Sequence, residues 1–236
     1  MAATVHHAPI HLVPNAPVAE RALLPGDPGR ALRLAQHLLT VPMQVLNTNR
    51  GLWGYTGTAT DGRPLTIQST GMGGPSAAIV AEELIGLGAR RLIRVGTCGA
   101  LNGDLSLGEL LVADAALCED GASRALGAGG RAEPDAALLA ALAAGGARTG
   151  LVVSTDLFYD PDPGRMERWA VAGVLAVEME AAALFTVAAR RGVAAACLLA
   201  VSDLLAGGGR ERIGQDALDA AERTLGEAGL AALSTT

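Results

Sequence analysis

Short apolar segments alternate with Ala/Leu-rich segments along most of the chain. Short apolar runs bounded by glycine and polar residues indicate strands, whereas longer runs with helical spacing indicate helices. The pattern predicts strands near 21–25, 42–47, 52–60, 63–70, 90–97, 108–116, 149–155, 173–178 and 194–202. It predicts helices near 28–39, 75–87, 134–144, 163–172, 179–191 and 214–232. This alternation is typical of a layered α/β domain with a largely parallel or mixed sheet.

The helix at 75–87 has the clearest boundaries and the clearest face. Pro75 suits its first helical position, and Gly88 stands just past its end. Four residues form its predicted apolar face: Ile79, Leu84, Ile85 and Leu87.

One glycine-rich stretch, 125–134, interrupts this alternation, and the same pattern of strands and helices is found before and after it. We interpret it as a surface loop, since helices and strands resume after it. No internal repeat is visible, so we expect one domain over residues 1–236.

The charged residues exclude several classes of function. All 18 basic residues are arginine, so neither a Schiff-base lysine nor a P-loop lysine exists. The formal net charge of −6 argues against a nucleic-acid partner. It leaves room for a local cationic pocket.

Cysteine and histidine usage argues against a metal site and against a nucleophilic triad. Cys98, Cys118 and Cys197 lack metal-ligand spacing, and all four histidines lie within the first 37 residues. No apolar run has transmembrane length. We therefore expect reduced thiols, no metal, no membrane partner and a cytoplasmic location.

The segment from Arg91 to Ala100 carries the most informative charge. Arg94 lies near the end of an apolar strand, just before Gly96-Thr97-Cys98-Gly99, which we interpret as a turn. An arginine beside free backbone N–H groups suits an anion. The alternative is an edge-strand arginine that pairs with a surface carboxylate.

Three other turns have residues that suit a ligand, and each also has an ordinary structural explanation. Gly26 and Arg30 stand at the start of the predicted helix at 28–39, a suitable place for phosphate or a plain strand-to-helix turn. Arg50 lies in a turn, where arginine is usually a solvated charge. Met72 lies in a glycine-rich turn that lacks a dinucleotide fingerprint.

Carboxylates end two of the predicted strands. Glu178 and Glu180 straddle the step from a strand to an Ala-rich helix, where acids complement the helix dipole. Two acids exceed what capping needs, and a carboxylate at this edge can accept hydroxyl protons from a ribose. Asp203 ends another apolar strand, where a desolvated aspartic acid can act as an acid.

The motifs PGDPGR, NRGLWGYTG, STGMGGPS, RVGTCGA, STDLFY, VEMEAAALF and VSD follow one another along the chain. In order and approximate spacing they resemble the purine nucleoside phosphorylases of the hexameric bacterial type. These enzymes belong to the wider nucleoside phosphorylase/uridine phosphorylase family. The resemblance runs from about His11 to Asp203, and it implies a three-layer α/β/α domain around a central mixed sheet.

The resemblance also implies roles for individual residues. It assigns phosphate to Gly26, Arg30, Arg94 and Thr97, with Arg50 arriving from a neighbouring subunit. It assigns ribose to Met72, Met179 and Glu180, with the neighbour's His11 near the 5′-hydroxyl. It places the base among Cys98, Gly99, Phe158, Tyr159 and Val177, with Asp203 protonating the purine N7.

Two positions remain open within the resemblance. The arginine that assists the aspartic acid in the family would fall at Asp216, so either Arg210 or Arg212 could take that role. Glu178 belongs to the motif but has no assigned role.

The expected activity is phosphorolysis of purine (2′-deoxy)ribonucleosides, with inorganic phosphate as co-substrate and no cofactor. The expected assembly is a hexamer built as a trimer of dimers. The alternatives are a uridine phosphorylase, a hydrolytic nucleosidase and a non-catalytic nucleoside-binding regulator. A uridine phosphorylase should have a Gln-x-Arg pair soon after Tyr159, where this chain has Asp160-Pro161-Asp162-Pro163.

Overall fold

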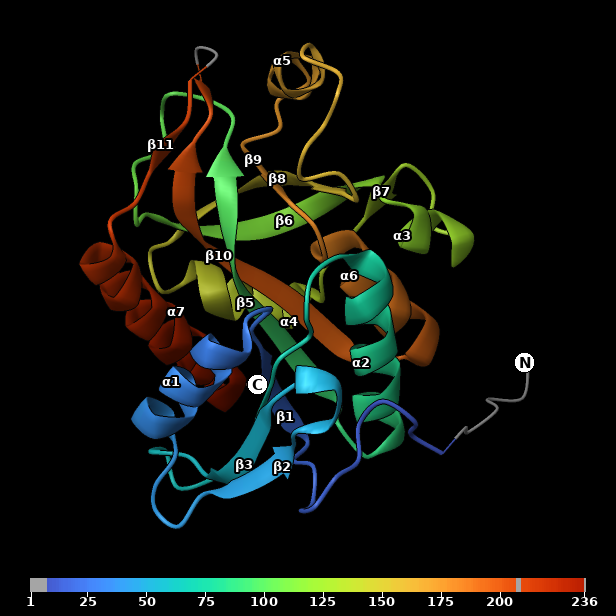
Figure 1. Cartoon of the computed structure of the whole chain (residues 1–236), viewed down its shortest axis with the longest axis vertical. Helices are drawn as coiled ribbons and strands as arrows, with labels where there is room; N and C mark the ends of the chain where they lie inside the picture. Colours follow the sequence, from blue (N-terminus) through green and yellow to red (C-terminus); the bar gives the residue numbers. More distant parts are fainter. Residues whose placement is uncertain (1–7, 207–208, 236) are drawn as a thin grey trace.

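A computed structural model describes residues 8–206 and 209–235. Within these residues, 11 strands join one mixed sheet (Figure 1). The strands are β1 (Arg21–Leu24), β2 (Gln44–Asn47), β3 (Gly54–Thr58), β4 (Pro64–Gln68), β5 (Arg91–Ala100), β6 (Leu110–Glu119), β7 (Arg131–Ala132), β8 (Arg148–Thr155), β9 (Ala176–Glu178), β10 (Ala194–Leu204) and β11 (Glu211–Arg212). Strands from both halves of the chain meet in this sheet, which supports the proposal of one domain.

The sheet closes on itself around its centre. β10 pairs with β6 on one side and with β5 on the other, and β9 joins β5 to β8, which pairs with β6. β1, β4, β3 and β2 extend the sheet outward from β5. The long central strands therefore bring residues from distant parts of the sequence to one end of the closed ring.

Helices cover both faces of the sheet (Figure 1). They are α1 (Pro28–Leu38), α2 (Gly74–Gly86), α3 (Gly121–Ala125), α4 (Ala136–Ala143), α5 (Arg165–Val171), α6 (Ala181–Arg191) and α7 (Gln215–Thr235), with a short 3-10 turn η1 (Asn49–Gly51). Core residues of α2 and α6 form one cluster, and those of α1, α4 and α7 form another. The three-layer α/β/α fold with a central mixed sheet is therefore confirmed.

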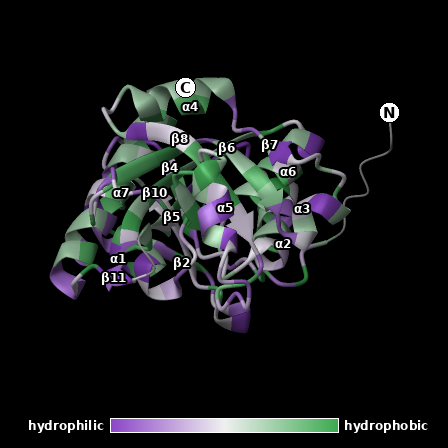
Figure 2. Ribbon diagram, turned by 90° about the horizontal axis from the view of Figure 1, so that it is seen from above, coloured by the Kyte–Doolittle hydropathy of each residue, from purple (hydrophilic) through white to green (hydrophobic). Residues whose placement is uncertain are grey.

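The side chains of β5 alternate between the two core clusters. Leu92 belongs to the core beneath α2 and α6, whereas Ile93 and Val95 belong to the core beneath α1 and α7. Successive side chains of a strand point to opposite faces, so Arg94 lies on the α6 face. In Figure 2 the strands in the middle are mostly hydrophobic, and hydrophilic residues gather on outer helices and loops.

Most predicted helices and strands are present. The differences concern the lengths of two long strands and three short elements that were not predicted. β5 and β6 run further than expected, and α3, β7 and β11 were not predicted. β7 lies inside the stretch 125–134 that we expected to be a loop, because two of its residues pair with β6. On α2, Leu84 and Ile85 are buried as expected, but Ile79 is 39% exposed.

None of the helices in the described part of the chain is long and apolar enough to cross a membrane.

We predict that Ile93→Ala lowers the free energy of unfolding by roughly 2–5 kcal/mol, because it leaves a cavity in a fully buried site. Ile79→Ala is the matched control, and should cost less than about 1 kcal/mol. Urea unfolding of the two variants measures the difference. Equal losses would contradict this assignment of the core.

Candidate active site

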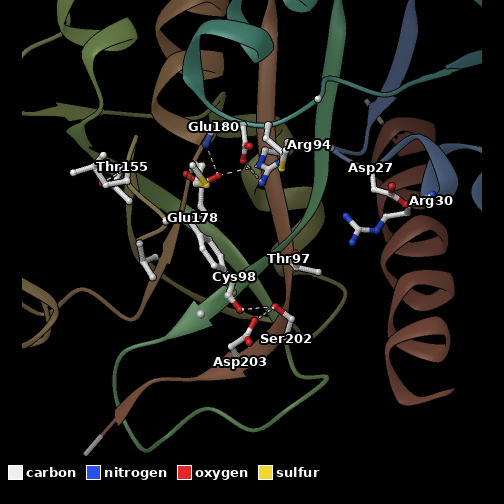
Figure 3. Close-up of a pocket in the computed structure, with 18 of the residues that line it drawn as sticks. Asp27, Arg30, Arg94, Thr97, Cys98, Thr155, Glu178, Glu180, Ser202 and Asp203 are labelled. Atoms are coloured by element: carbon white, nitrogen blue, oxygen red, sulfur yellow. Dashed lines mark hydrogen bonds and ion pairs between the residues drawn. The ribbon is translucent and has the colours of Figure 1, made fainter. Parts of the chain in front are cut away.

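A cavity of about 580 Å³ opens at one end of the sheet. It is lined by most of the residues that the sequence singled out: Gly26, Arg30, Arg50, Met72, Arg94, Thr97, Cys98, Gly99, Phe158, Val177, Met179, Glu180 and Asp203. Figure 3 shows Arg94 with Glu178 and Glu180 at one end, Asp203 with Ser202 at the other, and Thr97 and Cys98 between them.

Two of the predicted residues are not among those that line the cavity. The Tyr159 side chain is 89% exposed and contacts the Phe158 ring edge-on. His11 lies on the N-terminal segment, where its Nδ1 is 2.7 Å from Oε1 of Glu83.

The cavity lies where the neighbour of β5 on one side changes from β1 to β9. β1 pairs with β5 as far as Leu24 and Arg94, and β9 pairs with β5 from Gly99 onward. Between these points the edge of β5 faces the loop that follows β1. Within the described residues β5 thus has no strand partner on this side between Arg94 and Gly99, and Thr97 lines the cavity there.

The glycine-rich segment after Arg94 is strand and not the turn that we predicted. Gly96 to Gly99 pair with β10 over Leu199 to Asp203, with a bulge before Asp203. A Cβ on Gly96 would lie 2.7 Å from Cζ and Nη2 of Arg94. The glycine therefore leaves space for the guanidinium to lie along the strand.

Arg94 is a buried cation held by two carboxylates. Its Nε donates to Oε2 of Glu178 at 3.0 Å, and its Nη2 lies 2.5 Å from Oε2 of Glu180. Burial alone would lower the pKa of Arg94, but the charges of Glu180 and Glu178 outweigh it and raise that pKa above its ordinary value. The alternative of a surface ion pair is therefore wrong.

Glu178 caps helix α6 and fixes Arg94 at the same time. Its carboxylate accepts hydrogen bonds from the backbone N–H groups of Glu180 and Ala181 at 2.9 to 3.0 Å. The Ser154 hydroxyl also donates to it. These bonds occupy the acceptor positions of the Glu178 carboxylate. We therefore interpret Glu178 as a positioning group for Arg94.

Glu180 presents its carboxylate to the cavity. The backbone N–H of Gly73, in the glycine-rich turn before α2, donates to Oε1 at 2.7 Å. Oε2 pairs with Arg94. A carboxylate held in this way beside a cation can accept hydrogen bonds from the hydroxyls of a sugar.

Arg30 lies at the start of α1, where Asp27 caps the helix. The Asp27 side chain accepts from the Arg30 backbone N–H at 2.6 Å. The Arg30 guanidinium is buried and donates from Nε to Oε1 of Glu222 on α7 at 2.8 Å. In Figure 3 Arg30 stands beside Asp27, on the opposite side of Arg94 from Glu178.

Arg50 lines the cavity of its own chain from the exposed turn η1. It has a φ of +57°, and Gly51 follows with a φ of +71°. This conformation is unusual for a residue with a Cβ, and such strain often occurs at functional sites. A side chain at the mouth of a cavity can serve its own chain or an adjacent one.

The other end of the cavity contains a hydrogen-bonded acid. Oδ1 of Asp203 accepts from Nε of Arg210 at 2.8 Å, and the Ser202 hydroxyl lies 2.7 Å from Oδ2. The Arg210 guanidinium also lies over the Phe158 ring, 4.9 Å from its centroid. Arg210, and not Arg212, is therefore the arginine bonded to Asp203.

The walls between the two ends are apolar and glycine-rich. A Cβ on Gly99 would lie 2.5 Å from Cδ1 of Leu205, so a larger residue there would displace that side chain. Burial raises the pKa of the Cys98 thiol, which therefore stays neutral. A flat, uncharged ring suits this part of the cavity. Among the described residues, no three His, Cys, Asp or Glu side chains are arranged to hold a metal ion.

The sequence left four contributors unassigned: Glu178, Glu222, Ser154 and Arg210. Glu222 is 192 residues from Arg30 in the sequence, so no local pattern connects them. Arg210 was one of two open choices because its distance from Asp203 depends on the turn between β10 and β11.

Comparisons with known proteins agree with this geometry. The model of a family described as the phosphorylase superfamily matches residues 20–234. The DeoD-type purine nucleoside phosphorylase of Alkaliphilus metalliredigens is 40% identical over 202 residues, which cover 82% of this chain and 86% of that protein. The protein of the same name from Geobacillus kaustophilus is 42% identical over 195 residues, covering 79% and 81%. A solved uridine phosphorylase from Vibrio fischeri ES114 matches with a TM-score of 0.82 at 30% identity, covering 93% of each chain.

We predict that Gly96→Ala weakens the binding of inorganic phosphate by roughly 10-fold or more, because its Cβ displaces the Arg94 guanidinium. Gly103→Ala is the matched control, since a Cβ there meets nothing within 4 Å. Calorimetric titration of both folded variants with phosphate measures the effect. Unchanged affinity in Gly96→Ala would show that Arg94 does not contact the anion.

Proposed function

Because the chain belongs to the phosphorylase superfamily, we propose that it cleaves purine (2′-deoxy)ribonucleosides with inorganic phosphate. The products are the free purine and (deoxy)ribose 1-phosphate. The observation that carries this proposal is the pairing of Arg94 with Glu180 inside a cavity that Arg30 also lines. A cation for phosphate thus adjoins a carboxylate for sugar hydroxyls.

Phosphate lies between Arg30 and Arg94 in this proposal, near the Gly26 backbone and the Thr97 hydroxyl. Planar guanidinium groups bind phosphate oxygens in a fixed orientation. The anion is thereby held next to the sugar site, ready to approach C1′. Holding both reactants in one geometry supplies a large part of the catalysis.

Glu180 accepts hydrogen bonds from the ribose hydroxyls, and Met72 and Met179 pack against the sugar. As the glycosidic bond lengthens, the sugar acquires oxocarbenium character, which the phosphate charge stabilises. A phosphate oxygen then forms the bond to C1′, and the bonding electrons leave with the base. No electron acceptor or donor is needed for this transfer.

Asp203 donates a proton to N7 of the departing purine, whose negative charge would otherwise make it a poor leaving group. Arg210 fixes the carboxyl group through Oδ1. Phe158 and Val177 pack against the base, beside the Gly99 backbone. The proton returns from solvent after the base leaves.

The residues at the Asp203 end of the cavity, where the base would bind, favour a purine over the uridine of the alternative. In the proposed mechanism Asp203 gives its proton to N7, an atom that a pyrimidine lacks. A nucleosidase, in turn, has no need of Arg30, Arg50 and Arg94 around an anion. A hexamer, with Arg50 and His11 shared between subunits, and a cytoplasmic location remain parts of the proposal.

The experiment that tests the activity is a panel of nucleosides assayed with and without phosphate. We expect adenosine, inosine or guanosine to be cleaved only when phosphate is present, with sugar 1-phosphate as a product. Equal rates in phosphate-free buffer would favour a nucleosidase. A strong preference for uridine would favour the pyrimidine enzyme, and no turnover would favour a binding regulator.

We predict that Asp203→Asn slows adenosine phosphorolysis by about 10²- to 10⁴-fold, the range for loss of a general acid. A 7-methylated purine nucleoside is the matched control substrate, because its cationic base leaves without protonation. Steady-state kcat/KM values on both substrates measure the split. Equal losses would mean that Asp203 only positions the base.

We also predict that Arg50→Ala and Asp203→Ala complement each other if the site is shared between subunits. Each variant alone should be nearly inactive, whereas mixed assemblies contain some sites with both residues intact. Coexpression with two affinity tags isolates such assemblies. If verified mixtures regain no activity, Arg50 serves the cavity that it lines in its own chain.

A further inference from the structure

Glu222 is a buried acid on α7, outside every motif that the sequence analysis singled out. Its side chain is 3% exposed. Oε1 accepts from Nε of Arg30 at 2.8 Å. Oε2 accepts from Nε and Nη2 of Arg33 at 3.0 and 2.6 Å. One carboxylate therefore joins a cavity arginine to an arginine that is 45% exposed.

The position of Glu222 on α7 is unfavourable for an unpaired acid. Leu225, Gly226, Gly229 and Leu233, which follow at helical spacing, are buried like Glu222 itself. A carboxylate on such a face is costly unless it is paired and hydrogen-bonded. Its pairing with Arg30 and Arg33 offsets this cost.

The helix lies unusually close to its neighbours at this point. A Cβ on Gly226 would lie 2.4 Å from Cδ2 of Leu34, and a Cβ on Gly229 would lie 2.9 Å from Cδ2 of Leu23. The two glycines thus let α7 approach α1 and β1 closely. This approach brings Glu222 within hydrogen-bond distance of Arg30 in the first turn of α1.

The geometry of the contact determines how Arg30 faces the cavity. Glu222 engages Nε, the atom nearest the chain, and thereby limits rotation of the planar group. Arg30 still lines the cavity. An oriented donor binds an anion more tightly than a free one, because less conformational entropy is lost.

We propose that Glu222 is a positioning residue for phosphate, which makes the C-terminal helix a functional part of the anion site. This proposal rests on the proposed function, since it assumes that Arg30 contacts phosphate. Glu222 acts through Arg30 and touches neither substrate. The expected signature is a rise in the KM for phosphate while the KM for nucleoside stays unchanged.

Glu222→Gln tests the proposal, because glutamine keeps the shape and one acceptor but removes the charge. We expect the KM for phosphate to rise by about 5- to 30-fold, as for partial loss of a charge-assisted hydrogen bond. Glu227→Gln is the matched control. It removes a pair with His37 on the exposed part of the same helix, and should leave both KM values within about 2-fold.

A double-mutant cycle with Arg30→Ala separates positioning from a general structural effect. If Glu222 acts through Arg30, Glu222→Gln adds no further rise in the Arg30→Ala background. An equal rise in both backgrounds would overturn the proposal, and so would an unchanged KM in Glu222→Gln. Should Glu222→Gln fail to fold, the same cycle is run with Glu222→Asp, which keeps the charge but shortens the side chain.

The cycle also separates this proposal from the proposed function. If Arg30→Ala itself leaves the KM for phosphate unchanged, the assignment of Arg30 to phosphate is wrong. If Arg30→Ala raises that KM and neither Glu222 variant does, phosphate binding stands and the role of Glu222 is wrong.

Discussion

The burial of Arg94 in the sheet is the constraint on which the rest of the site depends. A guanidinium inside the sheet requires nearby carboxylates, and Glu178 and Glu180 supply them from one short segment. The carboxylate of Glu178 accepts hydrogen bonds from the N-terminus of α6, and this fixes the position in which it holds Arg94. Glu180 remains directed at the cavity. In the proposed function, this one ion-pair cluster positions both the phosphate and the sugar.

The fold provides this cluster by letting strands diverge. β5 leaves β1 after Arg94 and meets β9 at Gly99, and the cavity occupies the space between. A Cβ on Gly96 would collide with Arg94, and one on Gly99 with Leu205, and both of these side chains line the cavity. The same strand pairs with β10, which carries Asp203 to the far end. In the proposed function a nucleoside extends along β5, with its sugar near Arg94 and its base near Asp203.

Sequence patterns predicted what is local and missed what is distant. The strand at Arg94 and the carboxylates at the end of β9 follow from apolar runs interrupted by charge. The turn predicted at Gly96 is wrong, because glycine there serves the Arg94 side chain and not the backbone. β7 and β11 have two residues each, too few for any periodicity. The pairing of Arg30 with Glu222 spans 192 residues. It depends on the packing of α7 against α1, which the pattern of either segment alone does not predict.

The most direct measurement is a crystal structure of the protein with phosphate and an unreactive purine nucleoside analogue. We expect phosphate in contact with Arg30 and Arg94, ribose hydroxyls on Glu180, and the base N7 beside Asp203. Glu178 should keep its bond to Arg94. Phosphate bound elsewhere, with Arg94 still paired to Glu180 and distant from every ligand, would overturn the proposed function of this site.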